Sequence, residues 1–425
     1  MEPSSTSPAS LALSAARSYG AALRVRTGVR DEPPLAKAPA APPAAARTQP
    51  PRVCAKTVMD DSDPDIVFDA DGVSNWWYDY QAAKAKRPDA DRQRALLDAT
   101  LAEVREHGRG KPYDCVLGVS GGVDSSYVAY LARQHGLRPL LVHFDNGWND
   151  ELAVHNIEKI VKTCGYRLHT FVMDWPEFRD LQRAYFKAGV LDLEVPTDHM
   201  IFGALHQVAR RHGIGYVLTG TNFATEWLLP RAWHYSKRDL VNLQAIHRTH
   251  GETPMKRLPK IGVWQQLWYQ RVQRIREVDI LDLVPYRKTD AMRTLEREFG
   301  WTYYGGKHYE SVFTRFYQGW ILPMRFGIDK RRAHLSNLIL NGELTRDEAL
   351  AELAQPTYDP RQQMLDKQYV AKKLGWSAAE FDEILARPRT AHAAFGTDAR
   401  QRKLAELAIR TLHPLARLVR GTARK

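Results

Sequence analysis

The stretch LGVSGGVDSSYVAYL, residues 117–131, places a glycine-rich turn between an apolar segment and a helical one. Such a turn holds phosphate when the backbone N–H groups of its glycines and the positive end of the following helix face one anion. It is not a Walker sequence, because Gly-Lys-Ser/Thr occurs nowhere in the chain. Residues 120–126 therefore predict a phosphate site of another type.

The segments around this turn alternate between strand and helix patterns. Helical segments separate four buried strands, which read YDCVLGV, RPLLVHF, YRLHTFVMD and IGYVLTGTN. This order predicts an α/β fold, with a doubly wound parallel sheet and helices on both faces. Ligands bind such sheets at the carboxyl ends of the strands, where Asp145 and residues 220–222 also fall. We expect Asn149 to cap the helix that follows the second strand.

The side chains of the turn indicate its ligand. Ser120, Ser125 and Ser126 add hydroxyl donors to the backbone N–H groups around Gly121 and Gly122. An aspartate at position 124 would repel phosphate unless a divalent cation stood between them, so the turn predicts bound Mg²⁺. The alternative is a tight turn with a serine cap, which the specificity of the full seven-residue sequence disfavours.

The remaining chain divides by composition. Residues 1–52 are rich in Ala and Pro and are expected to be a disordered extension. Residues 231–395 have helical patterns with many aromatics and arginines, including one amphipathic helix over residues 260–281, and predict a substrate-binding region. The basic tail, residues 396–425, carries Leu404, Leu407, Thr411, Leu415 and Leu418 on one helical face. That face either docks on the protein or contacts a membrane surface or a partner.

Composition sets outer limits on function. The net charge of +12 favours anionic partners such as nucleotides, nucleic acid or a charged membrane surface. No apolar run has the length of a transmembrane helix. The chain's three cysteines are scattered and odd in number, which favours a reducing compartment and a cytoplasmic location.

Ser-Gly-Gly-x-Asp-Ser after an apolar strand resembles the PP-loop of the ATP pyrophosphatases, whose fold is adenine nucleotide α-hydrolase-like. Further segments, among them VHFDNGWNDELAVHNIEKIV, EVPTDHMIFGAL, TGTNFATEWLLP and WTYYGGKHYESVFTRFYQGWILP, are similar to the N-acetyl sugar amidotransferase family of bacterial surface-polysaccharide (O-antigen) synthesis. The similarity runs from about Cys54 to about Ala394. It implies a PP-loop domain over residues 111–230 that uses ATP and Mg²⁺. It also implies that the enzyme adenylylates an acetamido oxygen of a UDP-linked N-acetylated sugar (a uronic acid), and that nitrogen from ammonia then gives an acetamidino group.

The resemblance also assigns site residues. Pyrophosphate and Mg²⁺ would be held by Ser120, Gly121, Gly122, Asp124, Ser125 and Ser126. The adenosine would lie near Asp145, with Gly220, Thr221 and Asn222 on the border of the same pocket. Glu226 would be a second metal ligand or a proton acceptor.

Two basic runs follow. Lys307, His308, Glu310 and Arg315 form either a structural salt-bridge network or part of the active site. In the second case Lys307 and His308 would be catalytic residues and Arg315 would bind the substrate. Lys330, Arg331, Arg332 and His334 suit the UDP diphosphate or the uronate carboxylate, or else form an exposed helical face.

One part of the chain departs from the family, whose members usually carry two Cys-x-x-Cys pairs in residues equivalent to 53–110. Here Cys54 remains, but Thr57, Ser74 and Trp77 stand where the other cysteines would be. One thiolate cannot hold tetrahedral zinc, so we expect a degenerate module without zinc.

The nitrogen source is inferred from motifs that the chain lacks. No Gly-x-Cys-x-Gly nucleophile motif occurs, and no cysteine follows Met1. We therefore expect a separate glutaminase subunit to supply ammonia. The rival hypotheses are a tRNA-modifying PP-loop enzyme and a non-catalytic scaffold. The tRNA-modifying enzymes commonly carry an RNA-binding domain or catalytic cysteines, and neither Cys115 nor Cys164, both inside predicted secondary structure, is placed like one. We therefore expect no nucleic-acid partner.

Overall fold

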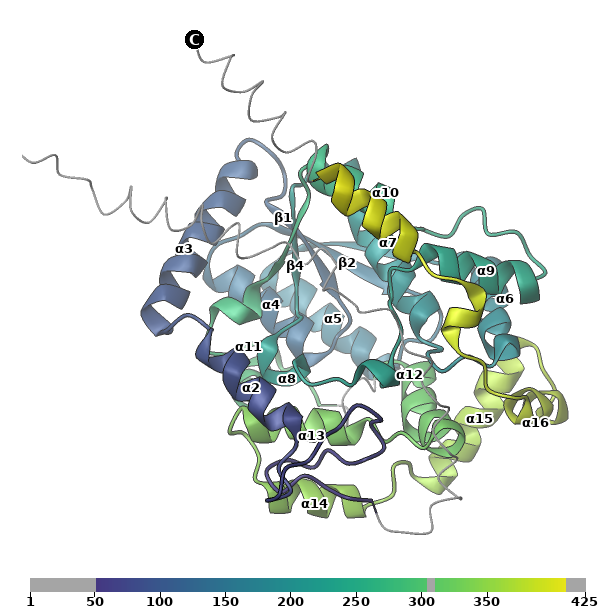
Figure 1. Cartoon of the computed structure of the whole chain (residues 1–425). Coiled ribbons are helices and arrows are strands. Elements are labelled where there is room, and N and C mark those ends of the chain that lie inside the picture. Colours follow the sequence, from purple (N-terminus) through teal and green to yellow (C-terminus); the bar gives the residue numbers. More distant parts are fainter. Residues whose placement is uncertain (1–50, 304–309, 410–425) are drawn as a thin grey trace, which may run out of the picture.

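A five-stranded parallel sheet forms the centre of the molecule (Figure 1). The computed structural model describes residues 51–303 and 310–409. The doubly wound α/β fold predicted from the sequence is confirmed. The strands lie in the order β3-β2-β1-β4-β5 and span Cys115–Val119 (β1), Pro139–Asp145 (β2), Arg167–Val172 (β3), Tyr216–Thr219 (β4) and Arg276–Asp279 (β5).

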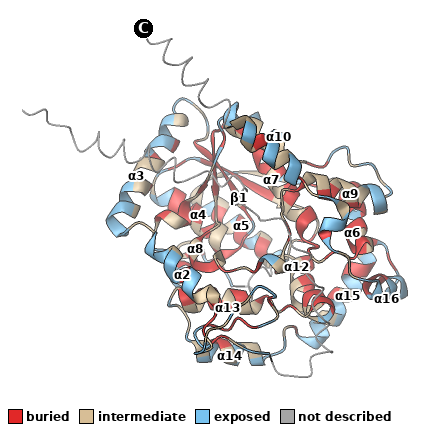
Figure 2. Cartoon of the chain, viewed as in Figure 1, coloured by how far each residue is buried: buried red, intermediate tan, exposed pale blue. Residues whose placement is uncertain are grey.

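Alternate residues of β1 enter two separate cores, as the two-residue period of a strand requires. Leu117 and Val119 pack on one face, and Val116 packs on the other. The strands at the centre of the sheet are coloured as buried in Figure 2. The first face is covered by α3 (Ala90–His107), α4 (Val123–Gln134), α5 (Glu151–Cys164) and α11 (Lys288–Phe299), and the second by α7 (Val195–Arg211) and α10 (Val263–Arg271).

A second body of helices lies beyond the carboxyl ends of the strands (Figure 1). Its core is rich in aromatic side chains and includes residues from α6 (Trp175–Ala188) and α9 (Leu240–His250). The other elements of this region are α2 (Asn75–Ala85), α8 (Phe223–Glu226), α12 (Val312–Phe316), η4 (Tyr317–Phe326), α13 (Arg331–Leu340), α14 (Arg346–Ala354), α15 (Pro360–Leu374) and α16 (Ala378–Ala386).

The prediction of one continuous helix over residues 260–281 is wrong. Helix α10 ends at Arg271, the backbone turns through Arg274 with φ of 56°, and β5 then pairs with β4. A further 3-10 turn, η3, covers Ile280–Leu283. Tertiary pairing decides this segment, because β4 offers an open edge that satisfies the backbone groups of β5. The domain boundary at residue 230 stays a prediction, although the sheet uses residues on both sides of it.

Two smaller expectations also change. Asp150, not Asn149, caps α5, with its side chain accepting from the backbone N–H of Leu152 at 3.0 Å. The last described helical residues are 399–409, and there Leu404 and Leu407 are 57% and 59% exposed while Ala405 is buried. These two leucines therefore do not dock the tail on the protein. Thr411, Leu415, Leu418 and residues 1–50 lie outside the described residues.

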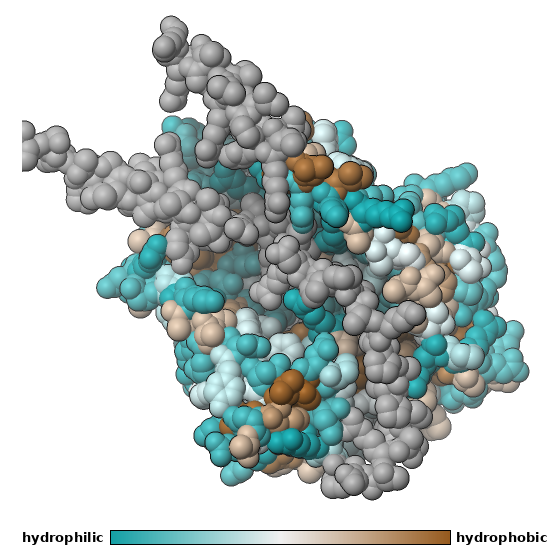
Figure 3. All heavy atoms as spheres, in the orientation of Figure 1, coloured by the Kyte–Doolittle hydropathy of each residue, from teal (hydrophilic) through white to brown (hydrophobic). Residues whose placement is uncertain are grey.

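The face drawn in Figure 3 is hydrophilic over most of its described atoms, with hydrophobic residues in a few separate spots. Within the described ranges, no helix combines the length and the apolar character that crossing a bilayer requires.

Candidate active site

The PP-loop is a tight turn whose own groups hold its shape. Gly121 has φ of 81°, and a β carbon there would overlap the carbonyl oxygen of Ala153, so only glycine fits. Gly122 caps the amino end of α4. The Ser120 hydroxyl accepts from the N–H of Gly122 at 3.2 Å and lies 3.2 Å from the hydroxyl of Ser125. The turn thereby places the hydroxyls of Ser120 and Ser125 beside the amino end of α4.

Ser126 gives an independent indication of a polar ligand. Its side chain is fully buried, and its hydroxyl has no hydrogen-bond partner among the described residues. Burying an unpaired hydroxyl costs about 1–3 kcal/mol, so such a group is rare unless something else pairs with it. The residues of the PP-loop therefore fit a bound phosphate chain.

Asp124 lies in the first turn of α4, partly exposed, where the sequence placed it. The hydroxyl of Tyr286 donates a hydrogen bond to its Oδ1. A carboxylate at a phosphate site fits a bound divalent cation, because the cation offsets the repulsion between the two anions. Within residues 51–303 and 310–409, no three His, Cys, Asp or Glu side chains gather as a metal site.

The loop after β4 lies directly against the PP-loop. The α carbon of Gly220 is so close that an added β carbon would stand 3.0 Å from the backbone nitrogen of Ser125. Asn222 caps α8, its Oδ1 accepting from the N–H of Thr225 at 2.8 Å, and the N–H of Thr221 donates to Thr219 at 3.3 Å. The structure therefore brings residues 120–126 and 220–222 together, as predicted.

Glu226 ends α8 on the same side of the sheet. Burial raises the pKa of the Tyr286 phenol well above its usual value, and the carboxylates of Asp124, Glu343 and Glu226 raise it further. The role of Glu226 at the site stays a prediction.

Asp145 lies on the wall of a cavity of about 440 Å³. Its Oδ1 accepts from the N–H of Gly147 at 2.9 Å and from Asn149 at 3.3 Å. Val154, another wall residue, directly follows Ala153, which touches the PP-loop. One wall of the cavity is therefore formed by α5, the helix whose first turn contacts the PP-loop. Its walls are formed by His143, Asp145, Gly147, Asn149, Val154, Ile157, Glu158, Leu168 and Thr170.

Three of the predicted substrate-binding cations have protein partners. Arg315 pairs with Asp366 at 2.9 Å and with Asp150 at 3.3 Å. Arg331 binds Asp329 at 2.8 Å and also backbone carbonyls of α14. Lys330 is buried, with its Nζ 3.4 Å from Glu194. These contacts favour the salt-bridge alternative for Arg315. Arg331 is paired and only partly exposed, so it does not belong to an exposed helical face. Contact of either residue with the substrate stays a prediction.

Of the other predicted residues in these two basic runs, the structure describes Arg332 and His334. Arg332 pairs with Asp60 at 2.9 Å, and so ties α13 to the amino-terminal module. His334 is half-buried within α13. Lys307 and His308 lie outside the described residues.

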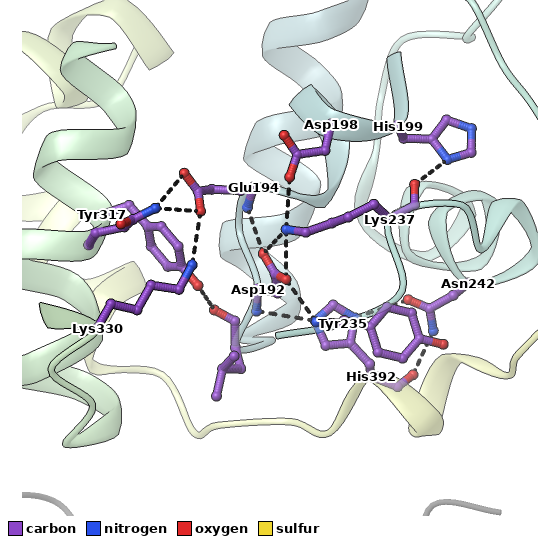
Figure 4. Close-up of polar contacts among 12 residues, drawn as sticks. Asp192, Glu194, Asp198, His199, Tyr235, Lys237, Asn242, Tyr317, Lys330 and His392 are labelled. Atoms are coloured by element: carbon purple, nitrogen blue, oxygen red, sulfur yellow. Dashed lines mark hydrogen bonds and ion pairs between the residues drawn. The ribbon is translucent and has the colours of Figure 1, made fainter. Parts of the chain in front are cut away.

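A buried charge cluster, which the sequence did not reveal, joins α7 to the helical region (Figure 4). Lys237 lies 2.8 Å from Asp192 and 3.1 Å from Asp198. Lys330 reaches it through Glu194, whose N–H donates to Asp192 at 3.1 Å. Burial raises the pKa of Asp192, but Lys237 and Lys330 outweigh this and leave it lowered. The only signal in the sequence was the spacing of Glu194 and Asp198 at the start of a helix.

Cys54, Thr57 and Ser74, three of the positions that carry cysteine in the family, lie together in the amino-terminal module. Cys54, Thr57 and Ser74 are fully buried, and the N–H of Ser74 donates to the Cys54 sulfur at 3.2 Å. Burial raises the pKa of Cys54, but hydrogen bonds from Ser74 and Thr57 outweigh it, so the pKa is lowered. Trp77 packs against the aromatic core. The expected absence of zinc stays a prediction.

Two family models match the chain. The model for asparagine synthase matches residues 111–222, and the model described as "LPS biosynthesis protein WbpG-like, C-terminal domain" matches residues 310–408. The first match contains the PP-loop, and the second contains α12 and α13. No curated protein matches the chain.

One solved structure to which the chain is similar is that of a "predicted subunit of tRNA methyltransferase" from Methanocaldococcus jannaschii. The two share 14% identity over 43% of this chain and 75% of that chain, with a TM-score of 0.26. A likeness this distant carries no argument about function.

Proposed function

We infer that this chain, a member of the O-antigen-type amidotransferase family with an asparagine-synthase-type PP-loop domain, converts an acetamido group into an acetamidino group. Its substrate is a UDP-linked N-acetylated sugar, a uronic acid, and its products include AMP and pyrophosphate. The observation that carries the proposal is the meeting of Asp124, the PP-loop and the loop of Gly220 at one edge of the sheet. Residues 310–408, which match the carboxyl-terminal domain of a lipopolysaccharide biosynthesis protein, include helices that lie beyond that edge in Figure 1.

The reaction needs two displacements because an amide oxygen is a poor leaving group. The acetamido oxygen attacks the α-phosphorus of ATP, pyrophosphate leaves, and the amide N–H proton is released. Ammonia then attacks the adenylylated carbon, AMP leaves, and the nitrogen loses a proton. The chain needs no nucleophile of its own for either step, but it must stabilise negative charge on the departing phosphates.

The residues of the site divide this work. Backbone N–H groups around Gly121 and Gly122, with the amino end of α4, would bind the β- and γ-phosphate oxygens. Asp124 would hold Mg²⁺, which neutralises phosphate charge when bound. Glu226 would accept the proton from the attacking nitrogen, and the cavity beside Asp145 would hold the adenosine.

We further propose that ammonia comes from a separate glutaminase subunit in the cytoplasm. The adenylylated intermediate hydrolyses in water, so a closed path for ammonia protects it. The isolated chain should then use ammonium salts at elevated pH, where free ammonia is present, and should fail with glutamine alone.

The decisive experiment incubates the purified chain with ATP, Mg²⁺, ammonium chloride and a panel of UDP-N-acetylated uronic acids. Mass spectrometry should detect replacement of the acetamido oxygen by NH, and chromatography should detect equal amounts of AMP. Asp124→Ala should lower turnover by about 10²–10³-fold or more, from the usual effect of removing a preorganised charge-stabilising group. Formation of ADP and phosphate, or hydrolysis of glutamine by this chain alone, would contradict the proposal.

A further inference from the structure

Tyr286 lies beside the PP-loop although it is 162 residues away from Asp124 in the sequence. Its hydroxyl donates a hydrogen bond to Oδ1 of that aspartate. The side chain is 6% exposed, and its ring tilts against Tyr127 with centroids 5.5 Å apart. Burial and ring packing restrict the rotamers of this side chain, which the structure places with its hydroxyl on the carboxylate.

The backbone around Tyr286 is itself anchored to the helical region. The amide of Asn341, at the end of α13, donates to the Tyr286 carbonyl at 3.4 Å. The guanidinium of Arg287 donates to the carbonyl of Gly342 at 3.1 Å. Tyr286 is therefore held from the carboxyl-terminal domain while its hydroxyl reaches the PP-loop.

A second contact from the same segment holds the loop from another side. Helix α11 packs along α4, and Trp301, just after α11, donates its indole N–H to the carbonyl of Gly121 at 2.9 Å. The segment from Tyr286 to Trp301 therefore contacts both the side chain and the backbone of the loop.

We propose that Tyr286 is a positioning residue that fixes the carboxylate of Asp124 for the cation bound with pyrophosphate. A carboxylate that is already oriented loses little rotational freedom when the cation binds, so the affinity for the metal-loaded anion rises. The proposal rests on the proposed function, because it takes Asp124 as the residue that holds Mg²⁺. It adds a residue outside the PP-loop motif, supplied by a segment that the loop sequence does not predict.

The test is calorimetric titration of the full chain with inorganic pyrophosphate, with and without MgCl₂. Tyr286→Phe removes the hydroxyl and keeps the ring. In the presence of Mg²⁺ it should weaken the binding of pyrophosphate by roughly 10- to 100-fold. This factor corresponds to the usual net contribution of a hydrogen bond to a charged group. Binding without Mg²⁺ should change by less than about 3-fold, and thermal unfolding should show that the variant is folded.

Tyr127→Phe is the matched control, because it removes a hydroxyl from the ring that packs against Tyr286. It should bind pyrophosphate like the wild type under both conditions. In an Asp124→Ala background, Tyr286→Phe should have no further effect, because the positioned group is gone.

The outcomes separate the two hypotheses. Wild-type affinity in Tyr286→Phe, or an equal loss with and without Mg²⁺, would refute positioning and leave the proposed function intact. Wild-type protein that binds no pyrophosphate with Mg²⁺ would refute the assignment of the PP-loop itself, and positioning with it.

Discussion

Gly220→Ala tests whether the contact between the β4 loop and the PP-loop sets the geometry of the site. An alanine β carbon would stand 3.0 Å from the Ser125 nitrogen and 3.1 Å from both the carbonyl carbon and the β carbon of Asp124. Two of these three atoms belong to the backbone of α4, so they cannot rotate away. The first turn of α4 must move by a few tenths of an ångström, at an overpacking cost of about 1–3 kcal/mol.

This displacement moves the groups expected to bind phosphate. A catalytic group misplaced by about 1 Å can cost about 10²-fold in rate, so a smaller shift should lower AMP formation by roughly 10-fold or more. Titration with Mg²⁺ and pyrophosphate should show weaker binding in the same variant, while urea denaturation should still give a cooperative transition.

Gly118→Ala is the matched control, since this glycine lies in β1 just before the loop. The three atoms nearest to its added β carbon belong to the side chain of Leu205, the closest at 3.3 Å, and that flexible side chain can shift. Wild-type turnover and pyrophosphate binding in Gly220→Ala would refute the reasoning, because the two loops would then not need their close approach.

Three further predictions concern stability and metal content. Burial lowers the pKa of His199, His234 and His392 to about 4, so the unfolded chain binds protons first as the pH falls. The free energy of unfolding should therefore decrease as the pH falls from about 6.5 to about 4. Each histidine should contribute about 1.4 kcal/mol for every unit by which folding lowers its pKa. Urea denaturation at several pH values checks this. Lys237→Ala should destabilise the protein by about 3–5 kcal/mol, because buried Asp192 loses its partner. Lys187→Ala, which breaks a pair with the exposed Glu252, should cost about 1 kcal/mol or less in the same assay. Elemental analysis should find far less than one zinc per chain, and stoichiometric zinc that disappears on mutation of Cys54 would contradict the degenerate module.

The local elements of the sheet could be predicted because their signals lie close together in the sequence. Strand β1, the glycine turn and α4 follow one another within residues 115–134, so apolar pattern, turn residues and helix start are all visible at once. Strand β5 could not be predicted in this way. The helical pattern of apolar residues in α10 continues through its four residues, so the pattern predicts helix there. Pairing with the open edge of β4 selects the extended backbone instead.

The sequence by itself determined the phosphate loop, the parallel α/β class and the position of Asp145 and Gly220 at strand ends, because a parallel sheet carries all carboxyl ends to one edge. Only the tertiary structure decided which distant side chains reach that edge. Tyr286 and Trp301 contact the loop, Arg315 pairs with Asp366, and Lys237 pairs with Asp192 through contacts between residues far apart in the chain. Such pairs leave no periodic signal, since a buried charge is stabilised by whichever partner the fold places beside it.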